Sequence, residues 1–307
     1  MKRWKRNKPH KMKQSWDDII FSFICNFFLV VFVIAVFYPL YFVVIASFSD
    51  PVFVNSGTPL LYPKGFNFNG YLEVFQDKRI WSGYINTIYY TVCGTLLGTI
   101  VVMMSGYAFS RKDLPGSRIL MKLYVFTMYF GGGLIPTYLV VSRLGLVNTR
   151  AAVIILGSVS VYNIIVVRSF MLSNIPEELL DAAKIDGCGN GRFFTQIVLP
   201  LSKAIVAVMV LYIAVGYWNS YFTAMVYVTD EGMYPLQLQL RKILLTATAA
   251  TSQGQDVIDP ELMKSLTDRV QLIKYGTIVV STAPIICLYP FVQKYFVKGV
   301  MIGSIKG

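Results

Sequence analysis

The sequence has very little of the chemistry that catalysis and metal binding require. Its 307 residues include one histidine, His10, and four cysteines that lie far apart in the chain. Histidine is the usual general base and metal ligand, and structural metal sites need closely spaced cysteines. The wide cysteine spacing also excludes a disulfide framework. We therefore expect no catalytic residue, no metal site and no cofactor bound by this chain.

Charged residues are scarce as well. They make up 14% of the chain, whereas hydrophobic residues make up 55%, and the mean hydropathy is +0.56. This balance is typical of integral membrane proteins and lies outside the range of soluble globular domains. The net charge of +12 sits at the ends of apolar segments and forms no soluble basic face, which argues against nucleic-acid binding. The composition predicts an all-α integral membrane protein.

A phosphate loop of the form G-x-x-x-x-G-K-[ST] is missing, so any work driven by ATP must come from a separate subunit. An ion-coupled secondary carrier would hold an ionisable residue in mid-membrane, and none is evident. A membrane-embedded enzyme of the glycosyltransferase type would need convergent carboxylates or histidines, which the apolar segments do not offer. These two classes are the alternatives to a transport subunit driven by a partner.

Six apolar segments are long enough to span a bilayer, for which about 20 residues suffice. They are expected at residues 19–49, 80–110, 123–142, 151–167, 204–226 and 274–290.

Basic residues mark the two ends of the chain. The arm of residues 1–18 has seven basic side chains in its first 14 positions, and the tail of residues 297–307 is basic without an acid. Because such segments stay in the cytosol, both termini are expected inside, around a transmembrane domain at residues 19–296. The acidic segment 229–271 is expected as an outer loop.

The third apolar segment contains the run Gly131 to Gly133 and Pro136. A broken helix is tolerated in a bilayer where its freed backbone faces protein or a water-lined cavity. Small residues also serve close packing between helices. Both interpretations fit this composition.

The longest polar interruption of the second half is residues 174–200, NIPEELLDAAKIDGCGNGRFFTQIVLP. Pro176 suits a first helical turn, and the acidic residues after it complement the positive helix end. Gly187 permits a left-handed conformation that ends a helix, and Pro200 suits the start of the next apolar run. A helix, a turn and a second helix are predicted here. Nothing in a bilayer requires such a connector, so it indicates docking to a soluble partner.

The spacing of this connector resembles the EAA loop of permease subunits in binding-protein-dependent ABC importers. The match comprises Asp181-Ala182-Ala183, three residues, Gly187, nine residues and the run Ile197 to Pro200. The family usually has glutamate at the position of Asp181, which is a conservative difference. The resemblance implies a type I ABC importer permease fold of six transmembrane helices, with a cytosolic coupling helix that seats in a groove of an ATPase.

Other motifs narrow the resemblance. Tyr38-Pro39 and the run Ser47 to Asp50 resemble the carbohydrate branch, in particular the maltose-type second permease. Gly132 to Tyr138, Leu144 to Leu146 and residues 298–307 resemble the subgroup that imports complex or acidic oligosaccharides.

The family resemblance also implies a setting, a bacterial cell membrane. It implies these partners: a second homologous permease in a heterodimer, two cytosolic ATPase subunits that use ATP and Mg, an extracellular solute-binding protein, an oligosaccharide substrate and membrane lipid. The residues implied in ATPase coupling are Glu177, Glu178, Asp181, Ala182, Ala183, Asp186, Gly187, Arg192, Leu199 and Pro200. A C-terminal ATPase contact would use Lys298, Gly303 and Lys306, and a frayed basic tail is the alternative.

Sugars are held by aromatic faces and by amide or hydroxyl groups. The candidates for a substrate path are therefore Asn163, Trp218, Asn219 and Tyr221. An interfacial aromatic belt is the alternative for Trp218 and Tyr221, and an interhelical hydrogen bond for Asn163. By family analogy residues 246–256 would reach into the binding protein, and a plain flexible loop is the competing view.

Overall fold

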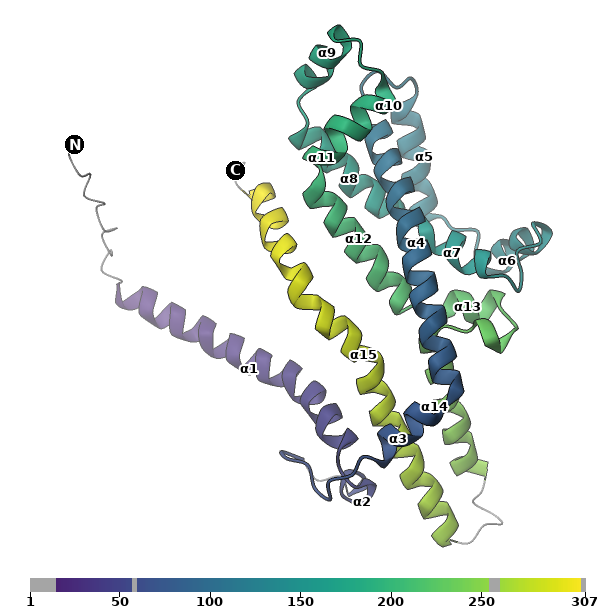
Figure 1. Cartoon of the computed structure of the whole chain (residues 1–307). Helices are drawn as coiled ribbons and strands as arrows, with labels where there is room; N and C mark the ends of the chain where they lie inside the picture. Colours follow the sequence, from purple (N-terminus) through teal and green to yellow (C-terminus); the bar gives the residue numbers. More distant parts are fainter. Residues whose placement is uncertain (1–14, 57–59, 254–259, 305–307) are drawn as a thin grey trace, which may run out of the picture. The chain divides into compact units, whose positions relative to one another are not determined.

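The computed structural model describes residues 15–56, 60–253 and 260–304, and every regular element within those ranges is a helix (Figure 1). The chain divides into two compact units, residues 1–68 and residues 69–307. Lipid offers the backbone no hydrogen bonds, and a helix satisfies its own N–H and C=O groups. The predicted all-α class is confirmed for the described residues.

The first unit contains a long apolar helix, α1 (Trp16–Ser47), and a short one, α2 (Pro51–Asn55). The most apolar part of α1 has a mean hydropathy of 2.9, and none of it is buried. After α1 the chain folds back on itself, because the backbone N–H of Asp50 donates to the carbonyl of Lys64 over 2.9 Å. The first expected apolar helix is confirmed.

The second unit contains helices of very different lengths. In chain order they are α3 (Asn69–Gln76), α4 (Lys78–Ser110), α5 (Ser117–Tyr129), α6 (Leu134–Arg143), α7 (Arg150–Ser158), α8 (Val161–Asn174), α9 (Glu177–Ile185), α10 (Asn190–Phe193), the π-helix η1 (Phe194–Val198), α11 (Leu199–Leu201), α12 (Lys203–Trp218), α13 (Phe222–Tyr227), the 3-10 helix η2 (Glu231–Met233), α14 (Leu236–Gln253) and α15 (Pro260–Ser304).

Helix α4 is central to the second unit, where it contacts α7, α8, α12 and α14 (Figure 1). Glycines on α4 make these contacts close. A Cβ added to Gly94 would lie 2.2 Å from the Tyr217 ring of α12, and one added to Gly98 would lie 2.8 Å from the Ser158 carbonyl of α7. Small residues allow such approaches between apolar helices. The start of α4 packs near α14 and its end reaches α9, so one helix extends from α14 to α9.

The third apolar segment is broken. Helices α5 and α6 meet at an angle of 115°, and Gly133 between them has a φ of +87°, which favours glycine. Nothing lies within 4 Å of a Cβ added to Gly131 or Gly133. The structure therefore has the broken helix and not the close packing through small residues.

Two further segments that were expected as single helices are interrupted. The fourth bends by 44° between α7 and α8, where Ser160 caps α8 and its hydroxyl accepts from the N–H of Asn163. The fifth ends at Trp218 and resumes as α13. Both segments were predicted as continuous helices, and both predictions were wrong. At the fourth segment the Ser160 cap starts a new helix although the hydropathy continues through the bend.

The segment 229–271 was expected as an irregular loop and is mostly helical. It contains η2, α14 and the beginning of α15. The residues of α14 that are buried include Leu236, Gln239, Leu240 and Ile243, a spacing that matches one helical face. Packing of this face against α4 and α15 explains the helix. The stretch 246–256 was expected to reach into the binding protein or to form a flexible loop. Its residues 246–253 belong to α14, and residues 254–256 lie outside the described residues.

Three helical stretches are long and apolar enough to cross a membrane by themselves: α1, α4 and residues 267–287 within α15. Three bent pairs pass the same test if each counts as one span: α5 with α6, α7 with α8, and residues 190–201 with α12. The last pair bends by 84° next to Ser202. By length and composition the described chain has three to six candidate spans.

Candidate functional site

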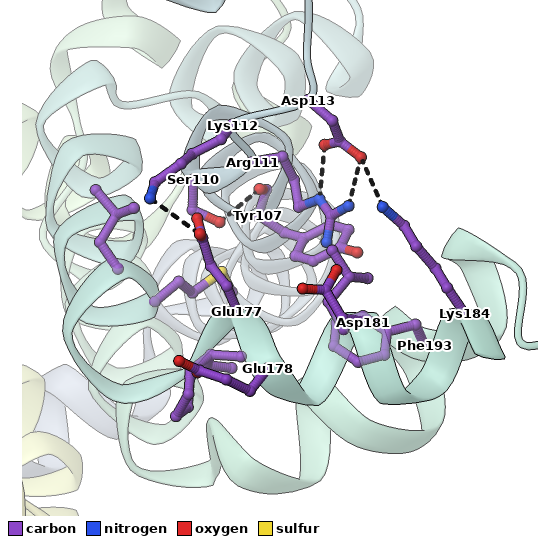
Figure 2. Close-up of a pocket in the computed structure, with 15 residues that line it drawn as sticks. Tyr107, Ser110, Arg111, Lys112, Asp113, Glu177, Glu178, Asp181, Lys184 and Phe193 are labelled. Atoms are coloured by element: carbon purple, nitrogen blue, oxygen red, sulfur yellow. Dashed lines mark hydrogen bonds and ion pairs between the residues drawn. The ribbon is translucent and has the colours of Figure 1, made fainter. Parts of the chain in front are cut away.

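A pocket of about 410 Å³ lies where the end of α4, the end of α8 and helix α9 meet (Figure 2). Its lining is rich in charged side chains of both signs. The lining residues are Tyr107, Ser110, Arg111, Lys112, Asp113, Met171, Leu172, Ile175, Pro176, Glu177, Glu178, Leu180, Asp181, Lys184 and Phe193.

Helix α9 is built from local signals at both of its ends. Pro176 occupies the N-cap, and Glu177 lies in the first turn, where a negative charge is favourable. At the other end, the N–H of Gly187 donates to the carbonyl of Lys184 over 3.0 Å, and the φ of Gly187 is +71°. Nothing lies within 4 Å of a Cβ added there. Within the described chain Gly187 therefore serves a left-handed backbone conformation, and no neighbouring group packs against it.

Ion pairs connect α9 to the turn after α4, and we call Arg111, Lys112, Asp113, Glu177 and Lys184 the α4–α9 latch (Figure 2). The guanidinium of Arg111 donates to both carboxylate oxygens of Asp113, over 3.0 and 2.6 Å. The Lys112 ammonium lies 2.9 Å from the Glu177 carboxylate, and that of Lys184 lies 3.7 Å from Asp113. The latch therefore joins residues from two distant parts of the sequence.

The hydrogen bond from Arg111 lowers the pKa of the Asp113 carboxyl below its ordinary value of 3.8, so Asp113 is charged at physiological pH. The Lys112–Glu177 and Lys184–Asp113 pairs are open to solvent and contribute little to folding stability by themselves, whereas the Arg111 side chain is only 12% exposed. The consequence of the latch is geometric, because the Lys112–Glu177 and Lys184–Asp113 ion pairs restrict how α9 can move relative to α4.

Helix α9 also has exposed side chains of mixed chemistry, and two of them, Glu178 and Asp181, line the pocket. Glu178, Asp181, Ala182 and Asp186 are exposed, and the isoleucine at the end of the helix, Ile185, is 87% exposed. Among the described residues Glu178 and Asp181 have no ion-pair partner within 4.0 Å. Ile185 is the most exposed large apolar side chain among the described residues.

The other predicted coupling residues have different positions. Ala183 is buried against the core, and Arg192 donates to Gln196 over 2.9 Å within its own helical turn. Leu199 and Pro200 lie in α11, away from the pocket lining. Of the predicted set, the pocket brings together Glu177, Glu178 and Asp181.

Sequence reasoning missed the α4 side of this site. Arg111 and Lys112 are recognisable in the sequence as a basic turn after an apolar run, but nothing local assigns them a partner. Lys112 and Glu177 are 65 positions apart, so their contact depends on how α4 and α8 pack.

A second pocket, of about 260 Å³, lies between α7, α8 and α12. Its lining is uncharged and includes hydroxyl and amide groups: Gly157, Ser158, Ser160, Asn163, Tyr212, Ile213, Gly216, Tyr217 and Ser220.

Among the predicted substrate-path residues, Asn163 is part of this lining and the others lie elsewhere. The indole N–H of Trp218 donates to the carbonyl of Ser281 over 3.2 Å, so Trp218 faces α15. The amide of Asn219 donates to the carbonyl of Val215 in the preceding turn. Tyr221 is partly exposed at the start of α13.

The predicted C-terminal contact falls largely beyond what can be described. The backbone of Lys298 and Gly303 belongs to α15, but their surroundings lie outside the described part of the chain. Lys306 lies outside the described residues altogether. Within the described residues, no three histidine, cysteine or acidic side chains come together as a metal site would require.

Long apolar helices interrupted by one exposed polar helix are the features of a membrane protein. No protein-family model matches the chain. It is 38% identical to the polygalacturonan/rhamnogalacturonan transport system permease protein YtcP of Bacillus subtilis, over 94% of this chain and 99% of the relative. It is 35% identical to protein LplC of Bacillus subtilis, over 88% of this chain and 89% of the relative.

A solved structure agrees with these relatives. The crystal structure of a bacterial ABC transporter involved in the import of the acidic polysaccharide alginate has a chain that superposes with a TM-score of 0.81 and 31% identity. The match covers 93% of this chain and all of that one. The chain belongs to the family of permease subunits of carbohydrate ABC transport systems, and the resemblance stated from its motifs is confirmed.

Proposed function

We propose that this permease translocates an acidic oligosaccharide and that α9 is the helix through which an ATPase drives it. The observation that carries the proposal is the exposed face of α9, where Ile185 projects beside the unpaired carboxylates of Glu178 and Asp181. An apolar anchor surrounded by charge suits a groove that supplies apolar contacts and basic side chains.

The proposed topology has six spans, one for each of α1, α4 and α15 and one for each bent pair. With both termini in the cytosol, the turn after α4 and helix α9 also face the cytosol. The segment from α13 to the start of α15 then faces outward. This arrangement corresponds to the type I importer fold and places α9 where a soluble ATPase can reach it.

The proposed partners complete the transporter: a second, homologous permease, two ATPase subunits that use ATP and Mg, and an extracellular solute-binding protein. The substrate class is inferred from the named relatives, since polygalacturonan, rhamnogalacturonan and alginate are polymers with acidic units. The uncharged pocket that contains Asn163 and Ser220 offers hydroxyl and amide groups suited to sugar hydroxyls.

The proposed mechanism is a shift between two states of the helix bundle. Closure of the ATPase pair on ATP would draw α9 toward its counterpart in the second permease. The α4–α9 latch would transmit this displacement to α4, whose other end packs against α14. ATP therefore changes which state is stable by acting on α9, and no nucleotide has to bind this chain.

The substitution Ile185→Glu tests the docking surface. The side chain is 87% exposed, so its replacement should leave the fold intact. Burial of one isoleucine contributes about 1.5–3 kcal/mol, so binding of the purified ATPase pair to the permease heterodimer should weaken at least about tenfold. ATP hydrolysis stimulated by the loaded binding protein should fall in parallel.

A matched control is Leu144→Glu, which places the same charge on a side chain that is 66% exposed in the turn after α6. In the proposed topology this turn faces outward, so ATPase binding should be unchanged. Equal ATPase affinity in the wild type and the Ile185→Glu complex would refute α9 as the docking helix.

A further inference from the structure

An arginine and a tyrosine meet on the side of the second unit opposite α9. The guanidinium of Arg241, on α14, lies over the ring of Tyr221 at 4.9 Å from its centroid. Its Nη1 lies 3.5 Å from the sulfur of Met225 on α13. Arg241 and Tyr221 are both exposed, so the pair is accessible to a ligand.

Three other cations in this part of the chain are neutralised by carboxylates: Lys242 by Glu231, Arg79 by Asp77, and Arg269 of α15 by Glu73 of α3. Arg150, which lies over the Tyr89 ring, resembles Arg241 in having no carboxylate partner within the described chain, but it donates to the amide oxygen of Asn86. Arg241 has no carboxylate within 4.0 Å among the described residues. Its positive charge is therefore available to an external anion.

The stacking on Tyr221 prepares Arg241 for one kind of anion. A guanidinium carries its five N–H donors in its own plane, so a ring against its face leaves those donors free. In the structure one of them contacts a thioether, which is a weak acceptor. A planar carboxylate matches the remaining donors as a bidentate acceptor. Because the stack restricts the side chain in advance, less conformational entropy is lost on binding.

We propose that Arg241, held by Tyr221, binds the carboxylate of a uronic acid unit as the oligosaccharide enters the permease. The inference rests on the proposed function, which makes the substrate acidic and this side of the unit the outer one. Tyr221 directly follows Ser220, which lines the uncharged pocket. The charged group of a sugar unit would thus be recognised next to the place where its hydroxyls can be bound.

A carboxylate of the binding protein is the competing ligand for the same guanidinium. It would use the same chemistry but would affect every substrate that this binding protein delivers. The uronate site instead predicts an effect confined to charged sugars. Comparison of an acidic oligosaccharide with its methyl ester, which has nearly the same shape and no charge, separates the two.

The experiment uses the complete transporter in proteoliposomes and measures uptake of galacturonate and alginate trimers and their methyl esters. Arg241→Gln should lower the kcat/KM for the acidic trimers about tenfold, the order expected for loss of a charge-assisted hydrogen-bonded pair. Uptake of the methyl esters should change less than about twofold. Arg241→Lys keeps the charge without the planar fork and should give an intermediate loss.

Two variants control for charge and for packing. Lys242→Gln removes a neighbouring charge that Glu231 already neutralises, so uptake of the acidic trimers should stay at the wild-type level. Tyr221→Ala removes the ring that holds the guanidinium and should reproduce part of the Arg241→Gln defect.

The outcomes distinguish this site from the proposed function. A wild-type transporter that imports neutral sugars but neither acidic trimer would overturn the substrate class, and the site with it. Acidic uptake in the wild type together with unchanged uptake in Arg241→Gln would overturn the site alone. Equal losses for acid and ester would assign Arg241 to docking of the binding protein and also overturn the uronate site.

Discussion

Gly94 of α4 is the position where one added methyl group should perturb the helix bundle most clearly. The ring of Tyr217 lies against it, and Gly94→Ala would place a Cβ 2.2, 2.4 and 2.6 Å from three ring carbons. Unbonded carbons normally approach to about 3.5–4.0 Å, so the overlap exceeds about 1 Å. The ring or helix α4 must therefore move.

The ring has little room to retreat. On α7, a Cβ added to Gly157 would lie 2.9–3.0 Å from the Tyr217 ring and hydroxyl, so glycines of two helices contact this side chain. The Tyr217 hydroxyl also donates to the carbonyl of Ile154.

The magnitude follows from these contacts. Overpacking costs about 1–3 kcal/mol, and loss of the phenol hydrogen bond about 1 kcal/mol more. The better helix propensity of alanine offsets about 1 kcal/mol. We expect a net destabilisation of about 2 kcal/mol, which corresponds to a thermal midpoint lower by about 3 °C for a chain of 307 residues.

The assay is thermal unfolding of the purified permease in detergent, with Gly216→Ala as the matched control. Gly216 lies on α12 with nothing within 4 Å of an added Cβ, so its substitution should be neutral or slightly stabilising. In a Tyr217→Ala background, Gly94→Ala should lose its cost because the clashing ring is gone. Equal costs of Gly94→Ala with and without the Tyr217 ring would refute the packing explanation.

Four further predictions concern the turns and the latch. Gly187→Asn should keep transport-coupled ATP hydrolysis, whereas Gly187→Val should lose most of it. A β-branched residue at a φ of +71° costs at least about 1–2 kcal/mol. Equal hydrolysis rates in the two variants would contradict this prediction. Charge reversal at one partner, Lys112→Glu or Glu177→Lys, should reduce transport-coupled ATP hydrolysis and shift the free energy of unfolding by less than about 1 kcal/mol. The double exchange Lys112→Glu with Glu177→Lys should restore the hydrolysis. A double variant as defective as the single ones would contradict the latch. Asn148→Ala should lower the free energy of unfolding by about 1–2 kcal/mol, because the side-chain oxygen accepts two backbone N–H groups at 3.0 Å. Asn148→Gly should cost less, because glycine tolerates the φ of +60°. Thermal unfolding of the two variants should give this order. The Arg111 hydrogen bond lowers the pKa of the Asp113 carboxyl below its ordinary value of 3.8, so Asp113→Asn should cost the same stability at about pH 8 and at about pH 5; thermal unfolding in which this cost disappears toward pH 5 would contradict the lowered pKa.

Hydropathy and capping patterns predicted much of the fold because they depend on residues that are close together in the sequence. The apolar runs correctly predicted α1 and α4, and the glycine run indicated the break between α5 and α6. The same patterns overlooked the bend before α8, where the hydropathy barely changes. They also failed for α14, which was predicted as part of an outer loop, because its burial against α4 and α15 depends on tertiary packing.

The sequence by itself determined the class of protein and the position of the connector, since membrane spans, helix starts and a left-handed glycine such as Gly187 are local properties. Tertiary structure decided which charged groups meet. Lys112 reaches Glu177 across 65 positions, and Arg241 stacks on Tyr221 from another helix. Such pairings depend on how whole helices pack, and no local pattern encodes that packing. The apolar segments thus identify a membrane protein, whereas the contacts between helices determine where the proposed coupling and substrate sites lie.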